Sequence, residues 1–169
     1  LQKLIKAEGL DSFLISDPVN VTYISGFLGH DSMILVTARK NFFITDSRYI
    51  EAARSSIRGF EVMLAQEGAF AALRDITAGA KLKKTGFEAM DLSAGVAARL
   101  EKAVPGTKFT GFNDLIENMR SIKDPAEIEA IKRSIRLTKK IFRAVSFHIK
   151  PGISEKSLAC MIETQYLNH

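Results

Sequence analysis

The residue types that most often carry chemistry are scattered in this chain of 169 residues. Its histidines are His30, His148 and His169, and none has a neighbour at the spacing of a metal-binding motif such as His-Glu-x-x-His. The carboxylates form no obvious acid/base pair, and Gly26 and Gly29 are too few glycines for a phosphate-binding loop. Read from its residues alone, the chain shows neither a catalytic site nor a metal site.

Two short segments nevertheless hold polar residues where loops are expected. His30 and Asp31 lie just before an apolar run, which makes them candidates for substrate contact, although an ordinary loop entering a hairpin also explains them. Asp46 and Arg48 lie between an apolar run and a helical pattern. For this second segment we favour structural roles: helix capping by Asp46 or Ser47 and an ion pair of Arg48.

Short apolar runs alternate with amphipathic segments over the first 121 residues. Strands are expected at 12–16, 32–37, 42–45, 61–65, 84–88 and 107–110. Helices are expected at 1–9, 48–57, 69–78, 93–104 and 114–119, with a turn or short helix at 20–26. The turn at 38–41 joins its flanking strands in a hairpin. The whole pattern predicts an α/β fold, a mixed β-sheet flanked by helices.

The pattern changes to long helices near residues 121–124, which predicts two domains, 1–121 and 122–169. Asp124, Pro125 and Glu127 have the types and spacing of a capping box with proline in the first turn. We therefore expect a helix over 125–148, followed by a last helix that begins at Ser154. Apolar residues recur along the first of these at Ile128, Ile131, Ile135, Phe142, Val145 and Ile149. So narrow an apolar stripe on so long a helix requires a partner surface.

The excess positive charge lies on this helix. Residues 1–119 hold 14 Lys/Arg and 14 Asp/Glu, whereas residues 120–143 hold 8 basic and 3 acidic residues. A nucleic-acid surface is one explanation, but aromatic interleaving and a recognisable binding motif are missing. A solvated face of an amphipathic helix is the favoured explanation, so we expect no nucleic-acid partner.

Other features of the composition concern location. No apolar run approaches the roughly 18 residues of a membrane span, and residues 1–10 do not resemble a signal peptide. The single cysteine, Cys160, rules out an internal disulfide and is interpreted as a small buried residue of a helix. We expect a cytoplasmic protein without a membrane partner.

Four motifs occur in order and together resemble the creatinase/prolidase/aminopeptidase P family. Their residues are Asn20, Tyr23, Gly26 and Phe27, then Thr45, Asp46, Arg48 and Tyr49, then Gly86, Phe87 and Glu88, then Arg120, Ile122, Lys123, Glu127, Ile128 and Ile131. Gly152 to Glu155 also resembles the start of a helix in the family's catalytic domain, with departures at Lys156 and Ser157. The likeness covers essentially the whole chain.

The resemblance implies a creatinase-like N-terminal domain followed by the first two helices of a pita-bread catalytic domain. It implies a full-length protein that is an Xaa-Pro dipeptidase or aminopeptidase, a hydrolase with two divalent metal ions (Mn, Co or Zn) that activate water. The metal ligands of that family lie beyond His169. We therefore expect no catalytic residue, no metal ligand and no activity in this chain by itself.

The resemblance also implies a homodimer, in which this domain packs against a neighbouring subunit and narrows access to the active site. His30 and Asp31 would then contact the proline-containing peptide in the partner's site. Two alternatives remain open: creatinase or a related hydrolase, and a peptidase-shaped binding module that has lost the metal ligands. Whether the five metal ligands follow in the full-length sequence separates an enzyme from such a module.

Overall fold

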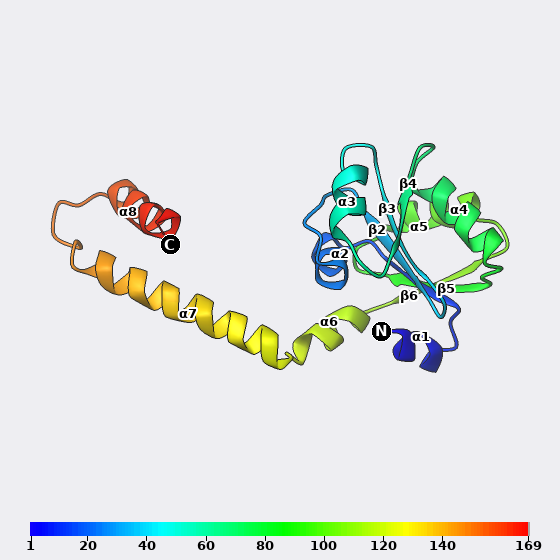
Figure 1. The fold of residues 1–169 in the computed structure, drawn as a ribbon, viewed down its shortest axis with the longest axis horizontal. Helices are drawn as coiled ribbons and strands as arrows, with labels where there is room; N and C mark the ends of the chain where they lie inside the picture. The colour runs from blue at the N-terminus through cyan, green and yellow to red at the C-terminus, as the bar shows by residue number, and fades with distance from the viewer. Residues whose placement is uncertain (169) are drawn as a thin grey trace. The chain divides into compact units, whose positions relative to one another are not determined.

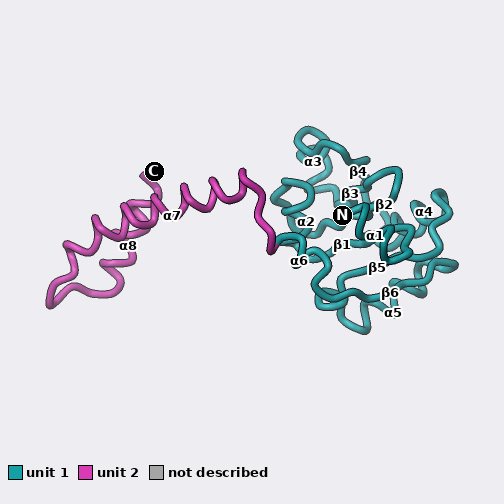
Figure 2. The backbone as a smooth tube through the Cα atoms, turned by 90° about the horizontal axis from the view of Figure 1, so that it is seen from below, with its two compact units in different colours: residues 1–120 teal, residues 121–169 magenta. Residues whose placement is uncertain are grey.

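The computed structural model describes residues 1–168 and divides the chain into two compact units, 1–120 and 121–169 (Figure 2). The first unit contains a six-stranded sheet in the order β4-β3-β2-β1-β5-β6. Its strands are β1 (Ser12–Ile15), β2 (Met33–Thr37), β3 (Asn41–Thr45), β4 (Glu61–Leu64), β5 (Lys84–Glu88) and β6 (Lys108–Phe112). The predicted α/β class with a mixed sheet is confirmed.

Strand directions give the sheet two unlike edges. β2 runs antiparallel to both β1 and β3, whereas β1, β5 and β6 are mutually parallel and β3 is parallel to β4. All strands except β2 therefore end at one edge, which we call the carboxyl edge, and begin at the opposite amino edge. The predicted hairpin is β2–β3, in which Ile34 pairs with Phe43 and Leu35 with Phe42.

Helices cover both faces of the sheet (Figure 1). One face packs on α1 (Gln2–Ala7), α2 (Pro18–Ser25), α3 (Ile50–Ser56) and α6 (Leu115–Ser121), and the other packs on α4 (Ala69–Gly79) and α5 (Ala94–Ala103). Side chains alternate between the faces, as strand geometry requires. Phe13 and Phe43 enter the first core, while Leu14 and Leu35 enter the second. Each such side chain contributes about 1.5–3 kcal/mol when fully buried.

Of the turn or short helix predicted at 20–26, the structure shows the short helix, α2, which begins two residues earlier, at Pro18. Its N-cap is Asp17, whose side chain accepts a hydrogen bond from the Asn20 backbone N–H, and Pro18 occupies the first turn. Gly26 ends the helix in the left-handed conformation, with φ of 71°. A residue with a side chain is strained at such a position, which accounts for the glycine.

The second unit consists of α7 (Pro125–Ser146) and α8 (Glu155–Leu167). The predicted capping box is present: the Glu127 N–H donates to Asp124 and the Asp124 N–H donates to Glu127, both at 2.8 Å. Ser154 caps α8 as predicted. The hydroxyls of Thr138 and Tyr166 connect the two helices at 3.0 Å.

Two predictions for this unit are wrong in detail. Helix α7 ends at Ser146 rather than at His148, because the turn that precedes Pro151 begins earlier than the apolar pattern suggests. Cys160 is exposed rather than buried. No residue of α8 in the described part is buried, so the apolar character of Cys160 does not place it inside a core.

Candidate functional site

Polar side chains from five segments converge at the carboxyl edge of the sheet. In open α/β sheets, ligands bind outside the carboxyl ends of the strands. Asp17 follows β1, Asp46 follows β3, Glu88 ends β5, and Glu117 lies on α6 just after β6. Asp31 reaches the same edge because the antiparallel strand β2 begins there. Motif residues of the first unit contribute to two separate clusters along this edge.

The first cluster is a buried polar joint formed by Asn20, Glu88, Glu117 and Arg120. The Asn20 amide has no exposed surface and donates to Glu88 Oε1 at 2.7 Å and to Glu117 Oε1 at 2.5 Å. Its Oδ1 accepts a hydrogen bond from Arg120 at 2.7 Å. One amide therefore connects α2, the end of β5 and α6, and both of its N–H groups are used. We call these four residues the joint.

Glu88 is the acceptor at the centre of the joint. Its Oε2 accepts the backbone N–H groups of Ser16 at 2.7 Å and of Asp17 at 2.8 Å. Burial raises the pKa of Glu88 above the ordinary carboxyl value, and the hydrogen bonds from Asp17, Ser16 and Asn20 oppose this rise without cancelling it. A buried carboxylate with three donors fixes the chain at the end of β1 and β5.

Arg120 adds a second contact that holds α6. Its guanidinium lies 5.6 Å from the centre of the Tyr23 ring, a cation–π distance. Asn20 and Tyr23 are one helical turn apart on α2, so Arg120 contacts a single face of that helix. The sequence alone revealed none of these pairings, because the partners lie as far as 100 residues apart. Their shared membership in the motif series was the only available signal.

Beside the joint lies a cavity of about 290 Å³ with acidic walls. Its carboxylates are Asp17, Glu88, Asp91, Asp114 and Glu117. The carboxylates of Glu88 and Glu117 are engaged in the joint, and Asp91 accepts the Ser16 hydroxyl at 2.6 Å. Within residues 1–168, no group of three or more His, Cys, Asp or Glu side chains is placed to hold a metal ion. The two-metal centre that the family resemblance implies therefore does not fit the described residues.

The second cluster surrounds Arg48, near the start of β2. Arg48 donates to Asp31 at 2.5 Å and to Asp46 at 2.6 Å and 3.0 Å, as an ion pair was expected to form. The guanidinium lowers the pKa of Asp46, and the two carboxylates raise the pKa of Arg48. The Arg48 and Asp31 side chains are 62% and 66% exposed and that of Asp46 is 31% exposed, so solvent screens both pairs and each contributes little to stability. Asp46 accepts the Arg48 N–H, while the N-cap of α3 is Tyr49, so the predicted capping role of Asp46 is wrong.

This cluster fixes the loop that carries the predicted substrate contacts. Phe27 stacks edge-on against Phe43 at 5.6 Å and against Tyr49 at 6.4 Å, which anchors the start of the loop. Asp31 anchors its end through Arg48, with a positive φ of 55°. Between the anchors, His30 is exposed and Leu28 is 86% exposed. The loop therefore presents these two side chains to the outside of the domain.

Gly29 is needed between these anchors. A Cβ at Gly29 would lie 2.4 Å from the Phe27 ring, so a side chain at this position would displace the ring. Glycine therefore lets the loop fold back over Phe27 without moving it.

The structure places the remaining histidines elsewhere. His148 is exposed just after α7, where its ring nitrogen lies 3.1 Å from the carbonyl oxygen of Ala144. This contact is local hydrogen bonding to the preceding helical turn. His169 lies outside the described residues.

Residues 1–122 match the Creatinase/Prolidase N-terminal domain family, and the chain belongs to that family. The predicted resemblance is thereby confirmed for the first unit. Among residues 1–168, no helix combines the length and apolarity that a bilayer span requires.

Several relatives are similar over nearly the whole chain. The uncharacterized peptidase YqhT of Bacillus subtilis is 29% identical over 96% of this chain and 46% of its own length. A crystal structure of an X-Pro aminopeptidase from Thermotoga maritima is 32% identical, with a TM-score of 0.85 over 95% of this chain and 47% of that one. An Xaa-Pro dipeptidase from Bacillus anthracis shares the fold, with a TM-score of 0.90 at 23% identity over 99% and 47% of the two chains. This chain spans about half the length of these relatives.

Proposed function

We propose that this chain is the non-catalytic N-terminal part of a metal-dependent Xaa-Pro dipeptidase or aminopeptidase. The observation that carries the proposal is the match to the Thermotoga maritima X-Pro aminopeptidase, which extends beyond the first unit and includes 95% of the chain. A curated Xaa-Pro dipeptidase of Pyrococcus horikoshii is 26% identical over 91% of this chain. On this proposal, α7 and α8 are the first helices of a catalytic domain, and the domain boundary lies at 121–122.

The full-length protein would cleave the peptide bond next to proline with two divalent metal ions held by residues outside the described part. This chain's own contribution would be the shape of the entrance to the active site. The loop 27–31, which we call the anchored loop, supports that role. Phe27 and Arg48 fix its two ends, and His30 and Leu28 between them are exposed. In a cytoplasmic homodimer, His30 and Asp31 would contact the substrate in the partner's site.

The activity is tested with the full-length protein. We expect the protein to cleave Gly-Pro or longer Xaa-Pro peptides, and chromatography of the products measures this cleavage. A chelator should abolish the cleavage, and Mn²⁺, Co²⁺ or Zn²⁺ should restore it. Creatine is the comparison substrate. Hydrolysis of creatine without cleavage of Xaa-Pro peptides would support the creatinase alternative, and inactivity towards both substrates would support a binding module.

The loop is tested by His30→Ala and Asp31→Asn in the same protein. We expect the KM for Xaa-Pro peptides to rise severalfold while kcat changes less, because these residues would bind substrate without touching the metals. His148→Ala and Asp75→Asn are matched controls, since His148 is an exposed histidine elsewhere and Asp75 is another exposed partner of an arginine. Unchanged KM values for dipeptides and longer peptides would remove His30 and Asp31 from the substrate site.

A further inference from the structure

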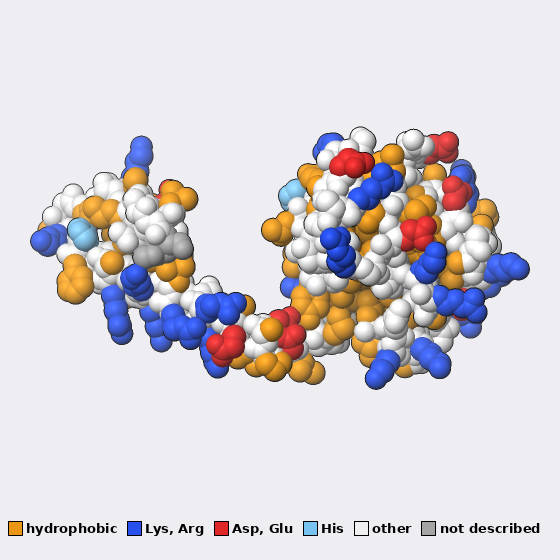
Figure 3. Space-filling model, viewed as in Figure 1, with side chains coloured by type: hydrophobic (Ala, Val, Ile, Leu, Met, Phe, Trp, Pro, Cys, Tyr) orange, Lys and Arg blue, Asp and Glu red, His pale blue; other side chains and the backbone are white. Residues whose placement is uncertain are grey.

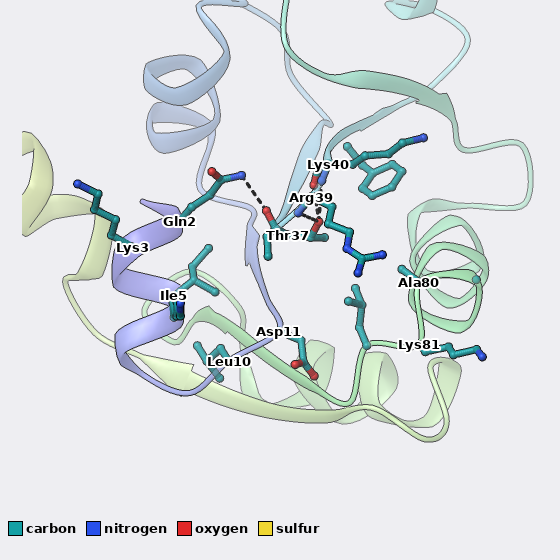
Figure 4. Close-up of a pocket in the computed structure, with 15 residues that line it drawn as sticks. Gln2, Lys3, Ile5, Leu10, Asp11, Thr37, Arg39, Lys40, Ala80 and Lys81 are labelled. Carbon is teal, nitrogen blue, oxygen red and sulfur yellow. Dashed lines mark hydrogen bonds between the residues drawn. The ribbon is translucent and has the colours of Figure 1, made fainter.

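The amino edge of the sheet, opposite the joint, contains a larger cavity. Its volume is about 1030 Å³, slightly above the range of small-molecule pockets, which is about 300–1,000 Å³. Helix α1, the β2–β3 turn and the end of α4 surround it (Figure 4). The family motifs contribute no residue to this cavity, and the proposed peptidase function does not use it.

The interior of the cavity is apolar. Ile5 and Phe42 are buried side chains of the two cores, and Leu10 and Leu82 are half-buried beside them. These side chains come from α1, from β3 and from the segments before β1 and β5. Leu10 and Leu82 therefore provide most of the apolar surface that a ligand can reach, whereas Ile5 and Phe42, which are 3% and 9% exposed, add little.

The rim of the cavity is basic. Lys3, Lys6, Arg39 and Lys81 line it, and no ion pair or side-chain hydrogen bond engages these four cations within residues 1–168. Figure 4 shows the Arg39 side chain extending from the β2–β3 turn over the cavity, whereas Lys3 and Lys81 extend towards solvent at its sides. Cations gathered around a concave surface raise the local potential and attract anions.

The one carboxylate in the lining, Asp11, leaves the rim net positive, because it balances one charge against the four cations of the rim. Asp11 accepts the backbone N–H groups of Lys83 at 2.8 Å and of Lys84 at 2.9 Å through one of its oxygens. Lys40, the remaining basic residue of the lining, is paired with Glu61 at 2.9 Å. Lys81 follows the C-terminus of α4, so part of its charge offsets the partial negative charge of that helix end. Arg39 has no such structural partner and is the strongest candidate for contact with an anion.

The position of Arg39 is set by the turn that carries it. The Thr37 hydroxyl donates to the Lys40 carbonyl at 2.6 Å and accepts the backbone N–H groups of Arg39 and Lys40. The Gln2 side chain donates to the Thr37 carbonyl at 2.9 Å, which ties α1 to the same turn (Figure 4). The backbone of the turn is therefore fixed against α1, and the Arg39 side chain extends from this fixed backbone.

We propose that this cavity binds a small organic anion with an apolar body, such as a medium-chain carboxylate. The hydrocarbon part would contact Leu10 and Leu82, and the carboxylate would accept hydrogen bonds from Arg39 at the rim. A guanidinium is the side chain best suited to bidentate binding of a carboxylate.

Isothermal titration of the full-length protein tests the proposal with octanoate as the probe. Octanol and octylamine carry the same chain without the anion, and butyrate carries the anion on a short chain. We expect octanoate to bind at least about tenfold more tightly than the other three, since one charge-assisted contact is equivalent to about a factor of ten. Raising NaCl from about 0.05 to about 0.5 M should weaken its binding, because rim charges are screened.

Two variants locate the binding site. Arg39→Gln should weaken octanoate binding about tenfold or more, and Ala38→Trp should block it by filling the cavity from the exposed turn. Arg99→Gln is the matched control, because Arg99 is an exposed arginine on α5 outside the cavity and without a side-chain partner in the described residues. Near-ultraviolet circular dichroism and thermal midpoints establish that each variant remains folded.

Three results would overturn the proposal. They are octanol binding as tightly as octanoate, full octanoate affinity in folded Arg39→Gln, and no octanoate binding at about 1 mM, where even weak sites are filled. None of these results depends on Xaa-Pro cleavage, so the proposal and the peptidase function are tested independently.

Discussion

At the scale of single residues, the joint and the anchored loop differ in energetic character. Asn20 and Glu88 are buried and fully engaged, so removing one partner leaves buried polar groups without hydrogen bonds. Arg48 and Asp31 are exposed and Asp46 is half-buried, and solvent screens their attraction. Substitutions in the joint should therefore affect stability, whereas substitutions at Arg48 should affect mainly the conformation of the loop.

Glu88→Gln should lower the free energy of unfolding by about 1–3 kcal/mol at pH 7. The NH₂ group of the new glutamine is a donor, and it must face other donors: either the backbone N–H groups of Ser16 and Asp17 or the Asn20 amide. Urea denaturation measures the loss. Glu101→Gln, at an exposed glutamate of α5, is the control and should change stability little.

The difference in free energy of unfolding between the wild type and Glu88→Gln, here called the deficit, should depend on pH. Burial raises the pKa of Glu88 above 4.5, so the folded chain keeps this proton to a higher pH than the unfolded chain does. The stabilisation that comes from protonated Glu88 is fully present below the pKa of Glu88 in the unfolded chain. It is lost as the pH rises through the pKa of Glu88 in the folded chain. Because glutamine does not titrate, the deficit should be larger near pH 4 than at pH 7. A deficit that grows with pH would contradict the raised pKa.

The sequence contained the residues of the joint but not their geometry. Asn20, Glu88 and Arg120 were notable only as motif members, since hydrogen bonds across as many as 100 residues leave no local pattern. The Arg48 ion pair with Asp46 was predictable because these residues are two apart. Its second partner, Asp31, was not, because that contact depends on the β2–β3 hairpin bringing two loops together.

At the scale of helices and strands, local signals determine most boundaries. Capping residues, glycines and the period of apolar residues are local, and they placed the strands and helices within a few residues of their observed ends. Burial is set by neighbouring elements, which explains the wrong prediction for Cys160. Ile141, which is 3% exposed, was likewise missing from the predicted stripe of α7 because the regular spacing emphasised Phe142.

Asp124→Ala should destabilise the first turn of α7 by about 0.5–2 kcal/mol, because it removes one side of the capping box. Hydrogen exchange of the amides at 126–128 should become faster. Asp124→Ser should restore most of the protection.

Glu129→Ala is the control for this change. It removes only an exposed ion pair with Lys132 on the same helix, worth a few tenths of a kcal/mol. Equal exchange rates in Asp124→Ala and the wild type would mean that the capping box contributes nothing measurable.

At the scale of the whole molecule, the second unit exposes more apolar surface than a monomer of its size favours. Ile128, Ile131 and Ile135 are 41%, 45% and 48% exposed, and Phe142 is 70% exposed. Lys and Arg side chains accompany them along α7 (Figure 3). We therefore expect the apolar stripe of α7 to be covered by another helix, domain or subunit.

We expect the 169-residue chain to associate into dimers through this stripe. Light scattering at high concentration should give twice the monomer mass, and Ile131→Glu combined with Ile135→Glu should return the chain to the monomer. Lys139→Glu changes the charge of the same helix outside the stripe and should leave the dimer intact. A monomer mass for the unchanged chain at high concentration would count against the prediction.

The joint also determines where the first domain can be cut. The last strand ends at Phe112, yet the buried Asn20 receives its final partners from Glu117 and Arg120 on α6. A recombinant domain shortened after the sheet would retain every strand and still leave this amide without two of its hydrogen-bond partners. The smallest portion that can be fused to another protein is therefore residues 1–120, which include the sheet together with α6 up to Arg120.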